Sequence, residues 1–371
     1  MTKHALNPSN PAGILPSLPR GAEVLLIRLR SLGDVVLLTP ALDALHAWRP
    51  DLRLSVMVQP ALAPVLEGNS AVAEVLPFTR FIAAARDLRR RRFPVVFNQH
   101  GGPTSAFLAL ASGAAVRVGW AGTQFALFYN VLVPGPEAFY GRARVHTVAH
   151  RMTQLFWTGL PRAPIPPARV FPQSEAVESV RARLAEHGVA PDARYAVVHP
   201  GAAFFTRRWP IERFAKLIDW LRQQHGIVSV IAPGPGDEPI AAAVREHLAP
   251  RAVVLEAVRV RELIALLAGA ALFVGHDTGP THLAVAAGRP VVMIFGSTSS
   301  EIWGPWQALH RVARNDFPCN PCPGDRCYAF DEPHCILSVT FEQVCEACEA
   351  LLTGRAAGAV PGAPVHIANA G

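Results

Sequence analysis

Residues 273–296, FVGHDTGPTHLAVAAGRPVVMIFG, combine two short apolar runs with a polar loop and a helical pattern between them. Phe273-Val274-Gly275 predicts the end of one buried strand and Val291–Phe295 predicts another, because short apolar runs bounded by Gly and Pro are typical of such strands. The residues between them predict a helix that has Pro280 at its first position and ends at Gly288. This order of elements constrains the chain to a parallel sheet with helices on its faces.

The loop His276-Asp277-Thr278-Gly279 is too polar and flexible for a core. The N–H groups in the first turn of the following helix have no partner within the helix, and the helix dipole is positive there. A phosphate or a sugar hydroxyl is therefore a favoured ligand of this loop. The alternative is a turn in which Thr278 or Asp277 only caps the helix.

The alternation of strands and helices occurs twice along the chain. The elements predicted in the N-terminal half are strands at 23–28, 54–58 and 95–98, a loop at 29–34, a helix at 35–48 and a polar turn at 100–102. Those predicted in the C-terminal half are helices at 175–187, 211–224, 238–248 and 261–267, and strands at 195–199, 228–232 and 253–255. Two such Rossmann-like parallel-sheet domains are expected to face a central cleft, where ligands bind beyond the carboxyl ends of the strands.

A proline-rich stretch separates the two halves. Residues 161–172, PRAPIPPARVFP, contain five prolines and predict a stiff linker. We expect an N-terminal domain over residues 21–160, a linker over 161–174 and a C-terminal domain over 175–352. Residues 1–20 are expected to form a disordered extension, and residues 353–371, dominated by Ala, Gly and Pro, a disordered tail.

The distribution of apolar residues indicates where in the cell the protein is expected. No apolar run reaches the roughly 20 residues that a membrane-spanning helix needs. The first twenty residues contain four prolines and no continuous apolar segment, which argues against a secretory signal. We therefore expect a cytoplasmic protein.

Arginine supplies almost all of the positive charge, because Lys3 and Lys216 are the only lysines among 35 basic residues. The densest group of arginines is RDLRRRR at residues 86–92. It predicts a solvated helix face, or else a patch that meets an anionic lipid surface or an anionic acceptor. Nucleic acid is not expected as a partner, because no nucleic-acid-binding motif or interleaved aromatic residue accompanies the cluster.

All six cysteines lie between residues 319 and 348, spaced as C-x2-C-x4-C-x7-C followed by C-x2-C. The paired C-x-x-C motifs suggest a zinc site. Residues 341–352 also have the pattern of an amphipathic helix, in which a spacing of three residues is typical of a buried stripe. Structural or unassigned thiols are the preferred interpretation, with a metal site or a disulfide as alternatives, so no bound metal is predicted.

Other loops that follow predicted strands carry polar residues that the fold does not require. Arg207 and Arg208 precede a helix and are suited to bind a pyrophosphate, while Glu238 offers a carboxylate to a ribose diol. In the alternative, the arginines are surface residues and Glu238 only complements a helix dipole.

Asp34 follows a glycine at the entry to the first predicted helix. As an N-cap it would accept backbone hydrogen bonds and take no part in chemistry. As a general base it would take a proton from an acceptor hydroxyl while that oxygen attacks a sugar carbon, and arginines and helix dipoles would stabilise the departing diphosphate. The helix terminus keeps the carboxylate ionised but weakly basic, which favours a proton transfer late in the displacement.

Three motifs in order resemble glycosyltransferase family 9, the lipopolysaccharide heptosyltransferases: LLIRLRSLGDVVLLTPAL at 25–42, VVHPGAAFFTRRWPIERFAKL at 197–217 and the stretch at 273–296. The resemblance covers most of residues 22–350. It implies a GT-B architecture, an ADP-heptose donor in the C-terminal domain, an acceptor sugar of the lipid A inner core in the N-terminal domain, and inversion at the anomeric carbon without a metal. The chain contains no Asp-x-Asp motif, in agreement with the last point.

The resemblance also implies roles for individual residues. Asp34 corresponds to the catalytic base, Arg207 takes the place of a phosphate-binding lysine, and Glu238 corresponds to a ribose-binding carboxylate. The full set expected to bind the nucleotide-sugar is Ser31, Gly33, Thr206, Arg207, Arg208, Glu238, Asp277, Thr278, Gly279, Pro280 and His282. The cysteine cluster resembles one found in many relatives.

We therefore expect an inverting, metal-independent, membrane-peripheral glycosyltransferase that moves a heptose or similar sugar from an ADP-sugar to the lipopolysaccharide inner core, without a cofactor. Its expected partners are the nucleotide-sugar donor, the lipid A-core acceptor and the inner-membrane surface. The alternatives are a GT-B sugar-nucleotide epimerase and a non-catalytic nucleotide-sugar-binding protein. A dehydrogenase is not expected, because RLRSLGD and not G-x-G-x-x-G follows the first strand.

Overall fold

The computed structural model describes residues 6–234 and 237–354, and it divides the chain into two compact units. Unit 1 ends at Ala168 and unit 2 begins at Arg169. This boundary lies inside the stretch predicted as a linker, which contains neither helix nor strand until α8 begins at Ser174. Each unit contains a six-stranded sheet in which every pair of neighbouring strands is parallel.

Unit 1 contains the strands β1 (Glu23–Ile27), β2 (Arg53–Val58), β3 (Val72–Pro77), β4 (Val95–Asn98), β5 (Val116–Trp120) and β6 (Val131–Val133). Its helices are α1 (Ile14–Ser17), α2 (Leu32–Val36), α3 (Thr39–Trp48), α4 (Phe81–Arg91), α5 (Pro103–Ala111), α6 (Glu137–Tyr140) and α7 (Thr147–Trp157). The strand order is β3-β2-β1-β4-β5-β6, so the direction of winding reverses between β1 and β4.

Unit 2 contains the strands β7 (Tyr195–His199), β8 (Val228–Ile231), β9 (Val253–Val254), β10 (Leu272–His276), β11 (Val291–Ile294) and β12 (His310–Ala313). Its helices are α8 (Ser174–Glu186), α9 (Ile211–His225), α10 (Glu238–Ala243), α11 (Val260–Gly269), α12 (Gly279–Ala286), α13 (Ser300–Trp303), α14 (His334–Leu337) and α15 (Phe341–Leu352). Its order is β12-β11-β10-β7-β8-β9, which reverses between β7 and β10.

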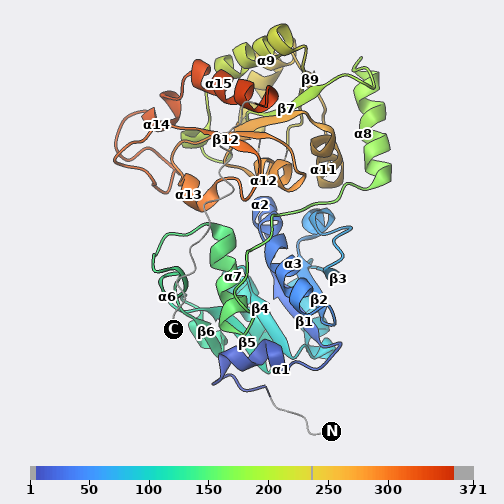
Figure 1. Ribbon diagram of the computed structural model, residues 1–371, viewed down its shortest axis with the longest axis vertical. Coiled ribbons are helices and arrows are strands. Elements are labelled where there is room, and N and C mark those ends of the chain that lie inside the picture. The colour runs from blue at the N-terminus through green and yellow to red at the C-terminus, as the bar shows by residue number, and fades with distance from the viewer. Residues whose placement is uncertain (1–5, 235–236, 355–371) are drawn as a thin grey trace. The chain divides into compact units, whose positions relative to one another are not determined.

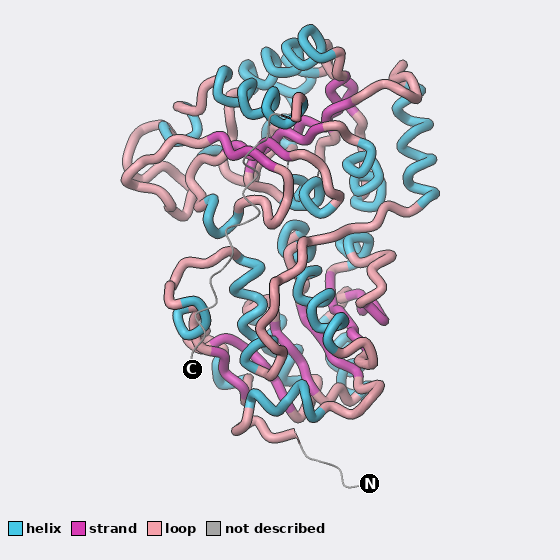
Figure 2. The backbone as a smooth tube through the Cα atoms, viewed as in Figure 1, coloured by secondary structure: helices cyan, strands magenta, loops and turns pink. Residues whose placement is uncertain are grey.

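The two units therefore share one strand order, that of a doubly wound Rossmann sheet. In each unit the strands lie in the middle and the helices lie outside them (Figures 1 and 2). Helices α3 and α7 lie side by side on one face of the unit 1 sheet (Figure 1). Ligands of such sheets bind beyond the carboxyl ends of the strands at the reversal, here called the switch point.

Buried strands explain why the sheets are covered on both faces. In β1, Val24, Leu25, Leu26 and Ile27 are all fully buried, so side chains pointing to either face are in a core. Leu25 and Ile27 belong to a core cluster with Leu88 of α4 and Phe93. None of the helices in the described ranges is long and apolar enough to span a bilayer.

Two predictions about the N-terminal half were wrong. Residues 1–20 do not form a disordered extension where the chain is described, because Ile14 and Leu15 of α1 are buried and the Leu15 N–H donates to the Thr158 carbonyl at 2.9 Å. The helix predicted at 35–48 is broken into α2 and α3. Pro40 has no N–H to donate to the Val36 carbonyl, which accepts the Thr39 hydroxyl at 2.8 Å instead.

The C-terminal half follows the prediction more closely. Strand β7 and helix α15 have the predicted ends, while the helix predicted at 238–248 consists of α10 followed by a π-helical turn, Val244–Leu248. The predicted tail at 353–371 lies outside the described residues after Gly354.

Candidate functional site

The first turn of α2 carries Asp34 at the switch point of unit 1. Asp34 is the third residue of α2 and not its N-cap, because the helix begins earlier than predicted and Ser31 occupies the N-cap position. The Oδ2 atom of Asp34 accepts hydrogen bonds from the Ser31 hydroxyl at 2.9 Å and from the Ser31 N–H at 3.3 Å. Gly33, which lies between Ser31 and Asp34 in the sequence, is the second residue of the helix and is buried. This arrangement is that of a capping box, which positions the carboxylate.

Two arginines pair with the same carboxylate. Arg28, directly after β1, pairs with Oδ2, and Arg151 of α7 pairs with Oδ1 at 2.5 Å and also donates to the Asp34 carbonyl. The side chains of Arg151, Arg28 and Asp34 are 3%, 11% and 17% exposed. Both carboxylate oxygens are therefore engaged, and the small cluster carries one net positive charge.

These neighbours control the protonation of Asp34. Burial alone would raise the pKa of its carboxyl, but the charges of Arg151 and Arg28 and the hydrogen bonds from Arg28 and Ser31 outweigh burial and hold the pKa well below its usual value. Burial lowers the pKa of Arg151 to about 9, with repulsion from Arg28 acting in the same direction and Asp34 opposing both. At neutral pH the carboxylate is ionised and weakly basic.

The turn after β4 lies on the other side of the same switch point. Arg28 donates to the Gln99 carbonyl at 2.6 Å, which joins this turn to the β1–α2 loop. The His100 Nδ1 lies 3.2 Å from the Arg30 carbonyl, so Nδ1 carries the proton that it donates. Burial and the charge of Arg28 lower the pKa of His100 to about 4, so the ring is neutral at pH 7.

Arg28, Arg151 and His100 were not among the predicted site residues. Arg28 was detectable, because it lies within the first quoted motif, three residues before Ser31. His100 belongs to a polar turn that follows a predicted strand. Arg151 lies 117 residues from Asp34 in sequence, and no local pattern in α7 indicates their contact.

In unit 2 the loops after β7 and β10 meet at the switch point. His276 at the end of β10 is fully buried; its Nε2 accepts the Trp209 N–H at 2.9 Å, and its Nδ1 donates to the Gly201 carbonyl at 3.1 Å. Burial, with repulsion from His199 and Arg208, lowers the pKa of His276 to about 3. His276 is therefore a neutral link that fixes the β7–α9 loop, and Arg207 with it, beside the β10–α12 loop.

Asp277 lies between two predicted donor-binding residues. Its Oδ2 is 3.8 Å from Nη1 of Arg207, and its Oδ1 is 3.8 Å from Nε2 of His282. The Nε of Arg207 and the Nδ1 of His282 are buried without a hydrogen-bond partner among the described residues. Because buried polar atoms are nearly always paired, this group has the character of a site that a polar ligand completes.

The start of α12 adds backbone donors to this group. Thr278 is the N-cap residue, but its side chain does not cap the helix; its hydroxyl lies 3.3 Å from that of Thr281, which donates to the His276 carbonyl. Gly279 and Pro280 are the first two residues of α12, whereas Pro280 alone was expected at the first position. The free N–H groups and the positive end of the helix favour an anion here.

Thr206 and Arg208 each have a hydrogen bond within the protein. The Thr206 side chain is 1% exposed, donates to the Gly324 carbonyl and lies 3.1 Å from the Ser297 hydroxyl, so its one proton is already used within the protein. The geometry thus gives Thr206 structural contacts, and its contact with the donor stays a prediction. Arg208 donates from Nε to the Ala202 carbonyl of its own loop at 2.8 Å.

The loop after β8 is described in part. The Glu238 side chain, predicted to bind ribose, lies outside the described residues. Asp237 was not predicted; its Oδ2 accepts the Gly234 N–H at 2.8 Å. A Cβ on Gly201 would lie 1.8 Å from the Asp237 Oδ1, so this carboxylate approaches the β7–α9 loop where only glycine fits without movement.

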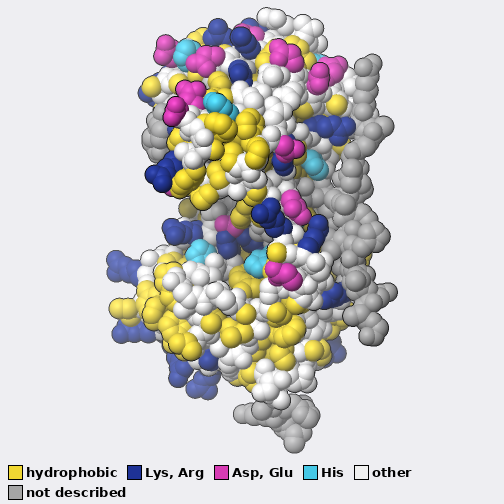
Figure 3. Space-filling view, turned by 90° about the vertical axis from the view of Figure 1, so that its left-hand side faces the viewer, with side chains coloured by type: hydrophobic (Ala, Val, Ile, Leu, Met, Phe, Trp, Pro, Cys, Tyr) yellow, Lys and Arg dark blue, Asp and Glu magenta, His cyan; other side chains and the backbone are white. Residues whose placement is uncertain are grey.

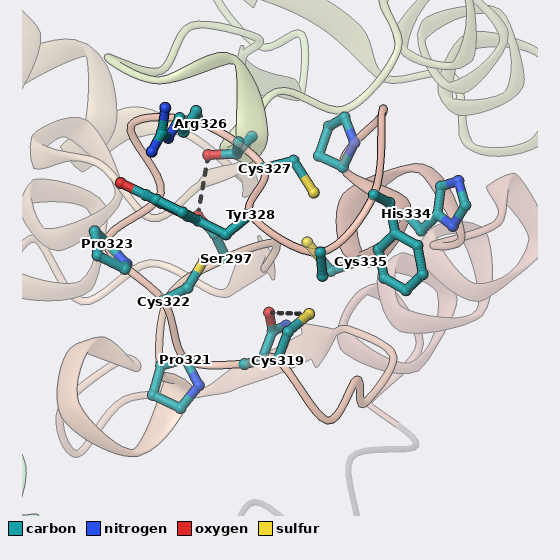
Figure 4. A pocket seen from close by; sticks show the side chains of 15 residues that line it. Ser297, Cys319, Pro321, Cys322, Pro323, Arg326, Cys327, Tyr328, His334 and Cys335 are labelled. Carbon is teal, nitrogen blue, oxygen red and sulfur yellow. Dashed lines mark hydrogen bonds between the residues drawn. The ribbon is translucent and has the colours of Figure 1, made fainter.

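Four of the cysteines line a pocket of about 350 Å³ next to Thr206 and Ser297 (Figure 4). All six cysteines are free thiols, so the disulfide alternative is wrong. In the described ranges, no group of three or more His, Cys, Asp and Glu side chains lies close enough to hold a metal ion. The Cys322 N–H donates to the Ser297 carbonyl at 3.0 Å, which attaches the cysteine-containing segment to the loop that follows β11.

The remaining two cysteines are core residues. Cys345 and Cys348 of α15 are 9% and 0% exposed and belong to the main core cluster of unit 2. Burial raises the pKa of Cys345 to about 12 and raises that of Cys348 as well. This confirms the interpretation of their spacing as a buried helical stripe.

Comparisons with known proteins agree with this geometry. A family profile described as "Glycosyltransferase family 9 (heptosyltransferase)" matches residues 81–329. The chain is 24% identical over 300 residues to lipopolysaccharide heptosyltransferase 3 of Escherichia coli K12, covering 75% of this chain and 83% of that one. It is 27% identical over 327 residues to lipopolysaccharide heptosyltransferase 1 of Pseudomonas aeruginosa, covering 82% and 87%.

Solved structures share the fold. A glycosyl transferase family 9 protein of Veillonella parvula has a TM-score of 0.76 at 22% identity, covering 90% of this chain and 97% of that one. The E. coli ADP-heptose lipopolysaccharide heptosyltransferase II has a TM-score of 0.74 at 21% identity, covering 90% and 99%. The predicted two-domain α/β architecture of the GT-B type is confirmed.

Proposed function

Because the chain belongs to glycosyltransferase family 9 and is a glycosyltransferase, we propose that it transfers a heptose from an ADP-sugar to the inner core of lipopolysaccharide, with inversion and without a metal. Its curated relatives are named lipopolysaccharide heptosyltransferases, and one solved relative is named for ADP-heptose. The identity of 24–27% to the relatives supports the class of reaction more strongly than the choice of sugar.

Unit 2 binds the donor in this proposal. The observation that carries it is the group formed by Asp277, Arg207 and His282 beside the start of α12, with two buried nitrogens that have no partner in the part of the chain that the structure describes. The Arg207 guanidinium and the helix N-terminus suit a diphosphate, and the Asp277 carboxylate suits sugar hydroxyls. Thr278, Gly279 and Pro280 supply the backbone that approaches the ligand.

Unit 1 binds the acceptor and supplies the base. Asp34 takes the acceptor proton late in the displacement, when the oxygen has begun to bond to the anomeric carbon and has become acidic. Attack from the side opposite the leaving diphosphate inverts that carbon. Arg28, Arg151 and Ser31 act as positioning residues, because they hold the carboxylate ionised and in one orientation.

The acceptor determines where this reaction takes place. A growing lipopolysaccharide core is anchored by lipid A, so we propose that the protein works in the cytoplasm at the surface of the inner membrane. Its donor is water-soluble and its acceptor is in the bilayer, which requires a peripheral position.

One observation favours a second candidate, a protein that binds the nucleotide-sugar without catalysis. Both oxygens of Asp34 are already paired, and its low pKa makes it a weak base. This candidate predicts binding of ADP-heptose without any glycosylated product.

The decisive experiment assays a panel of ADP-, UDP- and GDP-sugars with truncated lipopolysaccharide cores, using the wild type and Asp34→Ala. The wild type should glycosylate the core with ADP-heptose, while Asp34→Ala should lose transfer and keep its affinity for ADP, because the base acts in the transition state. Product from Asp34→Ala would remove Asp34 from the mechanism. Tight donor binding by the wild type without any product would favour the second candidate.

A further inference from the structure

Helices α4 and α5 and the turn that packs against α5 expose apolar side chains that the proposed reaction does not use. The exposed fractions are 39% for Phe81, 64% for Ile82, 46% for Phe107, 42% for Leu110 and 95% for Leu127. Leu127 belongs to the 3-10 turn Ala126–Phe128, which contacts α5 through the rings of Phe107 and Phe128, 4.8 Å apart. We call this surface, together with Arg86, Arg89, Arg90 and Arg92, the α4–α5 face.

The sequence spacing explains why these side chains point outward. Helix α4 buries Ala84 and Leu88 against the sheet, so Ile82, Arg86 and Arg89, spaced four and three residues apart, lie along its outer side. Helix α5 buries Ala106 and Ala109 and exposes Phe107 and Leu110 in the same way. A groove between the helices is lined by Arg86, Arg89, Arg90 and Ala111, which places the arginines next to the end of α5.

The positive charge of this face is largely uncompensated. Arg91 is neutralised by Glu74 and Asp87, and Arg90 lies 3.7 Å from Asp87. Arg86, Arg89 and Arg92 form no ion pair with any described residue. Arg89 packs on the backbone of Gly113, where a Cβ would lie 1.8 Å from its Nη1, so this guanidinium is held at the surface.

Two apolar residues of the face, Phe81 and Ile82, lie toward the edge of the sheet that carries Asp34, whereas Leu110 lies at the other end of α5, near the arginines. Helices α4 and α5 follow β3 and β4, so both begin at the carboxyl edge of the unit 1 sheet. Phe81 and Ile82 are at that start, and the arginines follow at about 6 to 15 Å farther along the axis of α4. On the face of unit 1 in Figure 3, hydrophobic side chains form broad areas with basic ones beside them.

We propose that the α4–α5 face docks unit 1 on an anionic bilayer surface. Its apolar side chains enter the interfacial layer, and its arginines bind lipid phosphates, which their planar guanidinium groups match with two hydrogen bonds. An apolar patch alone would suit a protein partner, and arginines alone would suit a free anion; the combination on adjacent helices favours the bilayer. The proposal rests in part on the proposed function, since a lipid-anchored acceptor must reach the edge that holds Asp34.

The test is co-sedimentation of the full-length protein with vesicles of phosphatidylcholine alone or mixed with phosphatidylglycerol. Wild type should bind the anionic vesicles and dissociate as salt rises. The variant Arg86→Glu/Arg90→Glu should bind them at least about 25-fold more weakly, because the loss of each basic side chain at such a surface removes roughly a fivefold factor and the new carboxylates repel the anionic lipids. Ile82→Asp/Leu127→Asp should also weaken binding while its residual binding stays salt-sensitive.

The matched control is Arg181→Glu/Arg245→Glu, which changes the net charge equally at two exposed arginines of unit 2 and should bind like the wild type. Equal binding to both kinds of vesicle, or an equal loss in the control, would overturn the proposal. Self-association of the wild type that Ile82→Asp/Leu127→Asp abolishes, without vesicle binding, would assign the face to a second copy of the chain.

Transfer to a lipid-free core fragment separates this proposal from the proposed function. The docking variants should keep that activity, since the fragment needs no bilayer. A wild type that binds anionic vesicles but transfers no sugar to the fragment would refute the proposed function and leave the docking surface standing.

Discussion

Asp34 and Asp277 both lie at the switch point of a sheet with the same strand order, yet their surroundings differ. Asp34 has hydrogen bonds or short ion pairs on both oxygens, from Arg28, Arg151 and Ser31. Among the described residues, the charged groups nearest to Asp277 are 3.8 Å away, and buried nitrogens of its neighbours Arg207 and His282 lack a partner there.

The difference shows two ways to prepare a polar site. A carboxylate with both oxygens paired is fixed in charge and direction before any substrate arrives, and it gains little from a ligand. Buried polar groups without a partner destabilise the empty site, and a ligand that forms hydrogen bonds with them removes this destabilisation. The paired carboxylate of Asp34 suits a group that accepts one proton. The unpaired groups around Asp277 suit the proposed binding of a nucleotide-sugar donor.

The largest expected difference is in stability. Asp34→Asn leaves two buried guanidinium groups without their anion and should lower the free energy of unfolding by about 3–5 kcal/mol. Asp277→Asn should lower it by about 1 kcal/mol or less, because pairs at 3.8 Å lack hydrogen-bond geometry. Urea unfolding followed by circular dichroism measures both, and equal losses would contradict the comparison.

The next effect is on ligand affinity. Arg207→Ala should weaken ADP binding by about 10- to 100-fold, the value of one charged contact to a phosphate. Arg28→Ala should leave ADP affinity unchanged, and Arg208→Ala should cause a smaller loss than Arg207→Ala because its Nε is held by the Ala202 carbonyl. Isothermal titration calorimetry with ADP tests all three; an unaltered affinity in Arg207→Ala would exclude Arg207 from the donor site.

A smaller effect concerns pH. Arg151 lowers the pKa of Asp34, so Arg151→Met should raise that pKa toward the usual value near 3.9, as followed by carboxyl NMR. Because the folded pKa of Asp34 is depressed, its contribution to stability is complete above about pH 4 and is lost as the pH falls through the folded value. Arg151→Lys retains the charge and should shift the pKa less; a shift as large as in Arg151→Met would show that packing and not charge sets it.

The smallest expected effect is a change in stability at His282, where ligand affinity and stability should respond differently to the same substitution. His282→Phe replaces a side chain whose Nδ1 has no partner within residues 6–234 and 237–354 by an apolar ring of similar size, so the free energy of unfolding should change by less than about 1 kcal/mol. Affinity for the ADP-sugar should nevertheless fall several-fold. A stability loss comparable to that of Asp34→Asn would mean that His282 has a structural partner.

The sequence was sufficient for the elements that depend on local pattern. The buried runs at 95–98 and 195–199 and the amphipathic stretch at 341–352 became β4, β7 and α15 with the predicted ends. Asp34, Arg207, Asp277 and His282 could be placed near the switch points from the sequence, because each lies in a loop or first helical turn after a buried run; their roles stay predictions.

What the sequence did not predict depends on contacts between distant segments or on the direction of a single side chain. The pairing of Arg151 with Asp34 arises only when α7 packs on the sheet. Thr206 and Arg207 are adjacent in a 3-10 turn, and the turn directs one hydroxyl to Gly324 and the next guanidinium to Asp277. The burial of α1 depends on Thr158, far along the chain, and not on its own short pattern.

The boundary at Ala168 and Arg169 has a practical consequence for protein engineering. Between the end of α7 at Trp157 and the start of α8 at Ser174 the chain forms no helix or strand, so a crossover between related genes at this boundary would cut no secondary structure. Each parental half would bring its own sheet and its own switch point. Under the proposed function, chimeras of two relatives that use different core sugars should inherit acceptor preference from the parent of unit 1 and donor preference from the parent of unit 2.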